Sequence, residues 1–279
     1  MRTVIGGVFV ASLLASSAFA QASPATWNGL SDRFQIDTGY FRLTANTELR
    51  YNGPQGGSGT IDFEDDLGLD QNVNTFWVDA TWRVGRRHQL KLGFTRVSRD
   101  RNDYTLQRDF TWGGETYNAG LTAASTSTSD ILGGYYRFAV VRTDRFEIGP
   151  TLGVGYLWLD ARIRATSSVT GPGGSQSRTL DESASTGSVT GAVGGYANAW
   201  LAKRLVVHGD FLYIKVNPEE SEASVTDWRI AADYYFFKNA GLGFQYKYNR
   251  YSYDRGILVS ELGGEVSYKG FQLFLSFLF

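Results

Sequence analysis

The chain has 279 residues, a formal net charge of -1, no cysteine, 33 glycines and 15% aromatic residues. This composition excludes a disordered chain, which would combine few aromatics with a large net charge. It also excludes a nucleic-acid partner, because no basic excess is available to neutralise phosphates. The lack of cysteine is compatible with an oxidising compartment.

The first twenty residues have the pattern of a secretory signal peptide. Arg2 supplies a positive start, residues 4–19 are apolar and small, and Ala18-Phe19-Ala20 offers small residues before a cut. The apolar stretch is too short for a membrane anchor. We expect residues 1–20 to be removed, residues 21–32 to form a short periplasmic segment, and residues 33–279 to form the folded domain. No later stretch is apolar enough to predict a transmembrane helix.

Most of the remaining chain alternates between apolar and polar residues. In residues 76–84, Phe76, Val78, Ala80, Trp82 and Val84 share one face, and polar residues lie on the other. Period-two alternation indicates strands, because successive side chains point to opposite faces. The pattern predicts about ten strands, over residues 33–51, 72–85, 88–108, 118–141, 145–165, 186–202, 204–216, 224–237, 240–254 and 263–279.

Short and long connections alternate along the chain. Short turns are predicted near residues 86, 143, 203 and 239, and long connections at 52–71, 109–117, 166–185 and 255–262, with a shorter one at 217–223. Residues 167–185, rich in serine, threonine and glycine, favour a flexible surface loop, and residues 171–174 favour a turn. The alternation is typical of an antiparallel, up-and-down outer-membrane β-barrel with short periplasmic turns. A twelve-stranded alternative requires a crossing pair within residues 100–125.

Three features favour a lipid environment over water. Trp82, Phe138, Phe146 and Phe236 lie close to the short turns, as in an aromatic interfacial girdle. The polar face carries too much charge for a dry core. The C-terminal strand has the pattern of the insertion signal that the barrel-assembly machinery reads in bacterial outer-membrane proteins, with Gly270, Leu273, Leu275, Phe277 and Phe279 as its residues. We therefore expect a monomer in the bacterial outer membrane, surrounded by its lipid and lipopolysaccharide.

The charged face predicts a network inside the barrel. Either this network lines a lumen that conducts ions or small solutes, or its ion pairs close a narrow barrel. We favour the closed interior, because ten strands enclose little more space than side chains fill. Arg42, Glu48 and Arg50 point inward only if the chain bulges near Tyr40-Phe41. The predicted inward residues are Arg42, Glu48, Arg50, Asp79, Arg83, Lys91, Arg137, Glu147, His208, Asp210, Arg229, Asp233 and Lys247.

The two histidines offer the only candidate catalytic chemistry. His88 lies at a short turn, and His208 and Asp210 share one face of a strand. This pair is similar to the histidine and aspartate chemistry of the omptin proteases, ten-stranded outer-membrane barrels with an extracellular site. His208, however, lies four or five residues from a short turn, which predicts the periplasmic half. A lipase-like serine-histidine pair would have to face lipid. A structural histidine is the favoured interpretation, and we expect no cofactor and no metal.

Two other motifs lie near the predicted outer rim. Residues 62–70 cluster five carboxylates, with a spacing that does not match an EF-hand calcium loop. We interpret this segment as a solvated acidic lid, although Phe63, Leu67 and Leu69 suggest that it packs over the barrel mouth. Arg96 and Arg99 end a strand and could either contact lipopolysaccharide phosphates or be solvated.

Residues 62–99 resemble a group of small proteobacterial outer-membrane β-barrel proteins. The matching residues are the acidic DFEDDLGLD loop and the strand pair WRVGRRHQLKLGFTRVSR, which has an Arg-His turn. The resemblance implies the fold and the location, and it transfers no catalytic residue. We expect a non-enzymatic barrel, acting as a small pore or as a structural or surface protein. The alternative is an outer-membrane hydrolase that uses His208 and Asp210.

Overall fold

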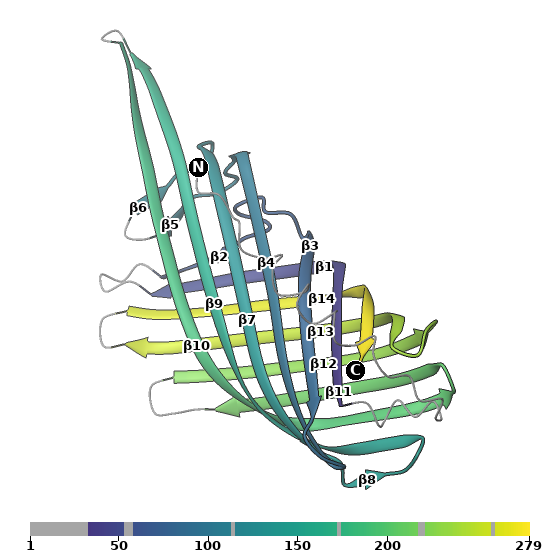
Figure 1. Ribbon diagram of the computed structural model, residues 1–279. Coiled ribbons are helices and arrows are strands. Elements are labelled where there is room, and N and C mark those ends of the chain that lie inside the picture. Colours follow the sequence, from purple (N-terminus) through teal and green to yellow (C-terminus); the bar gives the residue numbers. More distant parts are fainter. Residues whose placement is uncertain (1–32, 53–57, 113–114, 172–173, 217–220, 258–259) are drawn as a thin grey trace.

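A computed structural model describes residues 33–52, 58–112, 115–171, 174–216, 221–257 and 260–279. Ten long antiparallel strands form a closed barrel (Figure 1). Pairing of the first strand with the last closes the barrel. The barrel strands are β1 (Phe34–Asn52), β3 (Asn72–Arg83), β4 (His88–Thr105), β7 (Thr122–Phe138), β9 (Phe146–Gly171), β10 (Gly174–Ala202), β11 (Leu205–Val216), β12 (Ser221–Tyr235), β13 (Ala240–Ile257) and β14 (Ser260–Leu278).

In the described part of the chain, four short strands lie outside this ring. β2 (Ser58–Asp62) pairs with β1, and β8 (Val141–Arg142) pairs with β9 near the short-turn end. β5 (Phe110–Trp112) and β6 (Glu115–Tyr117) form a separate hairpin within the segment that the sequence left open as a further crossing pair. The prediction of a ten-stranded antiparallel barrel is therefore confirmed. In the described part of the chain, no helix is long and apolar enough to cross a membrane.

The prediction of a flexible loop over residues 166–185 is wrong. β9 continues to Gly171 and β10 begins at Gly174, and the two strands stay in register from Gly171↔Gly174 down to Phe146↔Ala199. Their hairpin rises above the other strands (Figure 1). The composition of this hairpin is similar to that of a loop because the ends of β9 and β10 extend into water. A strand that is surrounded by water needs no apolar outer face.

The outer surface of the barrel carries an apolar belt near the short-turn end. Among the exposed side chains there are Phe76, Trp82, Leu152, Val193 and Phe271. Further along the same strands the outward residues become polar or charged. The first charged outward residues are Arg42 on β1, Arg96 on β4, Asp130 on β7, Asp160 on β9, Arg250 on β13 and Lys269 on β14. We call the part of the barrel inside this belt the membrane half and the part beyond it the extracellular half, since short turns face the periplasm.

The interior of the extracellular half is filled by an apolar plug. Phe63, Leu67 and Leu69 of the first long connection are buried there against inward residues such as Leu159 and Ile163 of β9. The expectation that this acidic segment is a solvated lid is therefore wrong for its central part. Its apolar residues insert into the barrel, and the neighbouring carboxylates of Glu64 and Asp66 are buried with them. Asp65 and Asp70 stay exposed.

Candidate functional site

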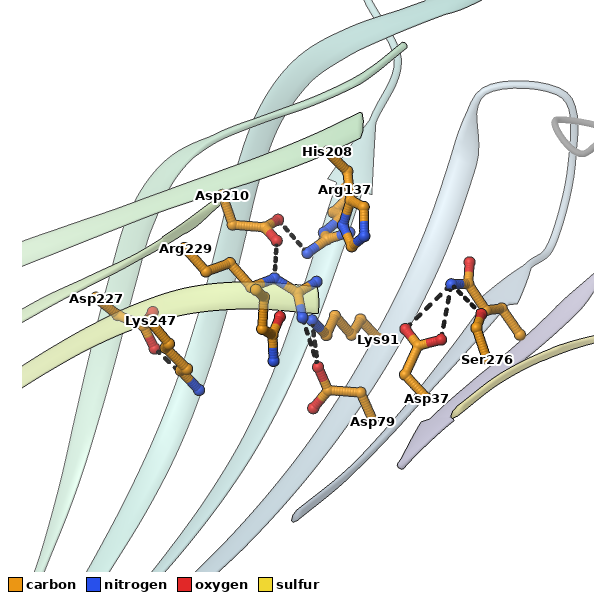
Figure 2. Close-up of polar contacts among 12 residues, drawn as sticks. Asp37, Asp79, Lys91, Arg137, His208, Asp210, Asp227, Arg229, Lys247 and Ser276 are labelled. Carbon is orange, nitrogen blue, oxygen red and sulfur yellow. Dashed lines mark hydrogen bonds and ion pairs between the residues drawn. The ribbon is translucent and has the colours of Figure 1, made fainter. Parts of the chain in front are cut away.

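Five charged side chains meet across the lumen of the membrane half, and we call them the ionic layer. Arg229 lies between two carboxylates: its Nε donates to Asp210, and its Nη1 lies 3.0 Å from Oδ2 of Asp79. Arg137 also donates to Asp210, and Nζ of Lys91 lies 2.6 Å from Oδ2 of Asp79 (Figure 2). All five side chains are at most 13% exposed, and they reach across the lumen from β3 and β4 to β7, β11 and β12.

Strand register explains how this layer forms. Asp210 of β11 lies directly opposite Arg229 of β12, so this pair is a cross-strand contact on the inner face. Asp79 lies opposite Gly93 of β4, where a Cβ atom would come within 2.6 Å of the Asp79 carboxylate. A glycine at this position therefore leaves room for the carboxylate that Arg229 and Lys91 share.

A second polar cluster closes the lumen near the periplasmic end. Glu147 is fully buried; its Oε2 lies 2.9 Å from Nη1 of Arg83, and Gln89 donates to its Oε1. The hydroxyl of Tyr196 donates to Glu147 Oε1 at 2.7 Å, and Arg142 of β8 approaches the carboxylate from the turn at 3.6 Å. The buried carboxylate is thus held from four sides, as burial of an ionised group requires.

The pair of His208 and Asp210, on which the alternative of a hydrolase depends, does not form. Nε2 of His208 lies 3.2 Å from Oδ1 of Asp233, while both oxygens of Asp210 accept from arginines. His208 and Asp233 border a cavity of about 60 Å³, which has room for a few water molecules. Asp37 borders it too and accepts from Gln35 Nε2 at 2.9 and 3.0 Å. The histidine thus belongs to a polar interior network.

Two further contacts lie between the ionic layer and the extracellular half. Nζ of Lys247 lies 3.8 Å from Oδ2 of Asp227, and Asn249 donates to the same carboxylate. Above them is a cavity of about 20 Å³, bordered by Trp77 and Tyr268. This volume holds no more than about one water molecule, so the two cavities do not make a wide channel.

The apolar plug is anchored by two ion pairs, one buried on both sides and one with an exposed arginine. Arg99 of β4 donates to Glu64 and, at 2.5 Å, to the hydroxyl of Thr47. Burial raises the pKa of the Glu64 carboxyl, although the bonds from Arg99 and the Thr47 amide lower it. Arg108 binds Asp66 on the neighbouring turn. These contacts hold the loop inside the barrel, and they place Arg99 inward rather than at the lipid surface.

Three predicted lumen residues face outward instead. Arg42, Glu48 and Arg50 lie on the outer face of β1, because the pairing of β1 with β14 and β3 shows no register shift near Tyr40-Phe41. The bulge that their inward orientation required is absent from β1. The inward residues of β1 include Asp37 and Thr47, and the bulge would have turned Thr47 outward. The other predicted residues face the lumen: Asp79, Arg83, Lys91, Arg137, Glu147, His208, Asp210, Arg229, Asp233 and Lys247.

The C-terminal strand completes the barrel. Leu273 and Leu275 face outward into the belt, while Gly270 faces the lumen close to the backbone of β1. The amide of Phe279 donates to the Phe34 carbonyl at 2.8 Å, which joins the two ends of the described barrel. The role of these residues as an insertion signal stays a prediction, as does the cleavage of residues 1–20, which lie outside the described residues together with residues 21–32.

The fold and its surface chemistry define a class. A closed antiparallel sheet with an apolar outer belt and a charged interior reverses the arrangement of a soluble barrel and suits a bilayer. The protein is an integral β-barrel of the bacterial outer membrane.

Comparison with the solved structure of one outer-membrane barrel agrees with this fold. The chain is similar to the outer-membrane protease OmpT of Escherichia coli, with 12% identity and a TM-score of 0.55 over 89% of this chain and 97% of that one. It also aligns with OprG of Pseudomonas aeruginosa (10% identity, TM-score 0.38, 91% and 99% covered). A third alignment is with Ail, the attachment invasion locus protein of Yersinia pestis (12% identity, TM-score 0.32, 89% of this chain and 99% of that one covered). No protein-family description and no curated protein matches the chain. At such identities the likeness to OmpT concerns the fold alone.

Proposed function

We propose that this protein is a non-enzymatic outer-membrane barrel with a plugged lumen. It functions at the cell surface and does not transport solutes. The observation that carries this proposal is that two different barriers occupy the lumen in series. The ionic layer crosses the membrane half, and the apolar plug fills the extracellular half. A solute would have to disrupt both.

The energetics of the two barriers support a closed state. Separating a buried ion pair leaves an uncompensated charge and costs about 3–5 kcal/mol. In the ionic layer each carboxylate has two cationic partners, so displacing one side chain exposes several charges. Above the layer, Phe63 and Leu67 are almost completely buried, and the buried Glu64 beside them is already engaged by Arg99, so an ion entering the plug would have to displace these contacts.

The same contacts argue against a hydrolase. The chain has only two histidines, His88 beside a short turn and His208 in the membrane half, so its extracellular mouth offers no imidazole base. Asp210 is neutralised by Arg137 and Arg229 and does not orient His208. The likeness to a protease barrel therefore does not extend to a histidine at the mouth.

The extracellular half provides a surface that could support the proposed function at the cell surface. Beyond the belt, β9 and β10 continue as a paired hairpin, and β10 pairs with β11 only from Val193 onward. Within the described residues, Gly174–Ala192 of β10 therefore has β9 on one edge and no paired strand on the other. Free strand edges of this kind are a common template for contacts with other chains.

Single-channel recording in planar bilayers tests the plugged lumen. Four proteins are compared: the unaltered chain, a variant with residues 62–70 replaced by a glycine-serine linker, the variant Asp79→Ala/Arg229→Ala, and the combination of both changes. Each is first shown to be folded by its altered gel mobility before and after boiling. We expect silence from the unaltered protein and discrete steps from the combined variant. Discrete steps from the unaltered protein would overturn the proposal and favour the small pore.

Activity assays test the non-enzymatic part. We expect the purified barrel to show no peptidase or phospholipase activity above that of a sample carrying His208→Ala. Hydrolysis that the unaltered protein supports and His208→Ala abolishes would favour the hydrolase instead.

A further inference from the structure

The outer face of β13, β14 and β1 carries basic residues directly above the apolar belt. Arg42 of β1 and Lys269 of β14 are both exposed. The register pairs Arg42 with Phe271 and Thr44 with Lys269, so the two cations occupy diagonal outward positions on neighbouring strands. Side chains at such positions are about 7–8 Å apart at their bases, and long ones can converge on one ligand.

Arg250 extends this group on the other side of Lys269. Tyr248 of β13 lies opposite Lys269, and Arg250 is the next outward residue. Arg250 contacts Glu265 at 2.7 Å, but half of its side chain stays exposed. In the described part of the chain, neither Arg42 nor Lys269 has a carboxylate partner. We call Arg42, Lys269 and Arg250 the rim cluster.

The other outward arginines near this level are already neutralised. Arg96 makes a two-pronged contact with Asp130, with both distances 2.6 Å. Arg162 and Arg164 share Asp181, and their guanidinium groups hold the pKa of that carboxyl well below its usual range. Arg96 and Arg99, for which the sequence left contact with lipopolysaccharide phosphates or solvation open, are engaged elsewhere, Arg96 with Asp130 and Arg99 with Glu64. The rim cluster differs because two of its three cations, Arg42 and Lys269, have no carboxylate partner among the described residues, whereas Arg250 is paired with Glu265.

An aromatic surface lies immediately below the rim cluster. Tyr40 and Phe271 are exposed on the belt at 64% and 61%. The rings of Phe244 and Phe271 stack with centroids 5.4 Å apart, and Tyr246 meets Phe271 edge to face at 4.9 Å. Moving outward along these strands, a flat apolar surface is therefore followed at once by uncompensated positive charge.

We infer that the rim cluster binds one lipopolysaccharide molecule of the outer leaflet, with its phosphate groups at Arg42 and Lys269 and its acyl chains on the aromatic surface. The ligand must be an amphiphile with anionic groups at the outer boundary of the belt, since the cations lie at the end opposite the short periplasmic turns. Arginine and lysine are the side chains that hold phosphate most strongly. Arg250, paired with Glu265 and half exposed, borders the two unpaired cations on the far side of Lys269. The site goes beyond the proposed function, because it lies on the outer wall and is independent of the lumen.

Lipid binding by the purified full-length barrel tests this site. The probes are bis-phosphorylated lipid A and the same lipid with both phosphates removed, and bound lipid is counted by native mass spectrometry during a titration. We expect one retained bis-phosphorylated molecule, bound about tenfold more tightly than the dephosphorylated one. Arg42→Ala/Lys269→Ala should weaken binding of the phosphorylated lipid by about tenfold or more, and Arg42→Lys/Lys269→Arg should retain it.

The matched control is Arg162→Ala/Arg164→Ala, which removes the same charge from the same outer wall. We expect this control to bind lipid A as the unaltered protein does. Equal loss in the control and the rim variant would show attraction by general charge and overturn the site. Unchanged binding in the rim variant, or equal binding of the dephosphorylated lipid, would overturn it too. Since the rim residues are exposed, the altered gel mobility of each variant confirms that the barrel has formed.

Discussion

Along β9 the two halves of the barrel follow opposite rules. In the membrane half its outward residues are apolar, such as Leu152 and Val154, and its inward residues include Glu147. In the extracellular half, Arg162 and Arg164 point outward and Ile163 points inward. The strand and its period of two continue without interruption, so only the surroundings change.

This comparison shows that one alternating pattern can serve two solvents. In the bilayer the outer face must be apolar, and the inner face can hold charges only if they are paired. In water the outer face is free to be polar, and the inner face is stabilised by burying apolar residues. At the outer boundary of the belt, the outer face changes from apolar to polar and the inner face changes from charged to apolar.

Breaking the ionic layer should have the largest effect on stability. Arg229→Ala leaves Asp79 and Asp210 each with one cationic partner fewer in a buried site. We expect a loss of about 3–5 kcal/mol in the free energy of unfolding, measured by urea titration of the protein in lipid vesicles. Arg162→Ala, on the exposed outer face, should change little. A loss for Arg229→Ala no larger than for Arg162→Ala would show that the layer does not stabilise the membrane half.

Opening the apolar plug should cost somewhat less. Phe63 is fully buried, and Phe63→Ala creates a cavity in the extracellular half. We expect a loss of about 3 kcal/mol, the low end for such a truncation, because the loop can open locally while the barrel stays folded. Hydrogen exchange of residues 61–69 measures this opening directly. Asp65→Ala in the same loop is exposed and should leave the exchange unchanged; equal exchange in the two variants would contradict a packed plug.

The outer boundary can be located with a single introduced charge. Val193 and Ser185 both point outward from β10, the first in the belt and the second beyond it. Val193→Lys should destabilise the barrel by about 2 kcal/mol, because lysine is costly within the apolar part of a bilayer. Ser185→Lys faces water and should have little effect. Equal costs at the two positions, in the same vesicle titration, would show that the belt does not end between them.

Much of the barrel can be predicted from sequence because strand alternation is a local property. The strand number and the outward phase of Phe76 to Trp82 follow from neighbouring residues alone. Errors arose where the sequence allowed two readings. The polar residues Arg42, Glu48 and Arg50 can face inward only with a bulge in β1, which the strand does not have, and the serine- and threonine-rich residues 166–185 have the composition of a loop although they form paired strands.

The candidate site is harder to predict, since its contacts join distant parts of the chain. Arg229 meets Asp79 across 150 residues, and alternation alone showed only that both face inward. The same holds for Arg99 and Glu64, which meet because the first long connection folds into the barrel.

The sequence by itself thus determined that the chain forms an outer-membrane barrel with a charged interior, because the period of two and the apolar outer face can be recognised from neighbouring residues. Only the tertiary structure decided which charges pair across the lumen, that the acidic loop becomes a plug, and that Arg42 and Lys269 lie together at the rim. These features depend on closure of the sheet and on strand register, which bring together residues whose spacing along the chain carries no sign of their contact.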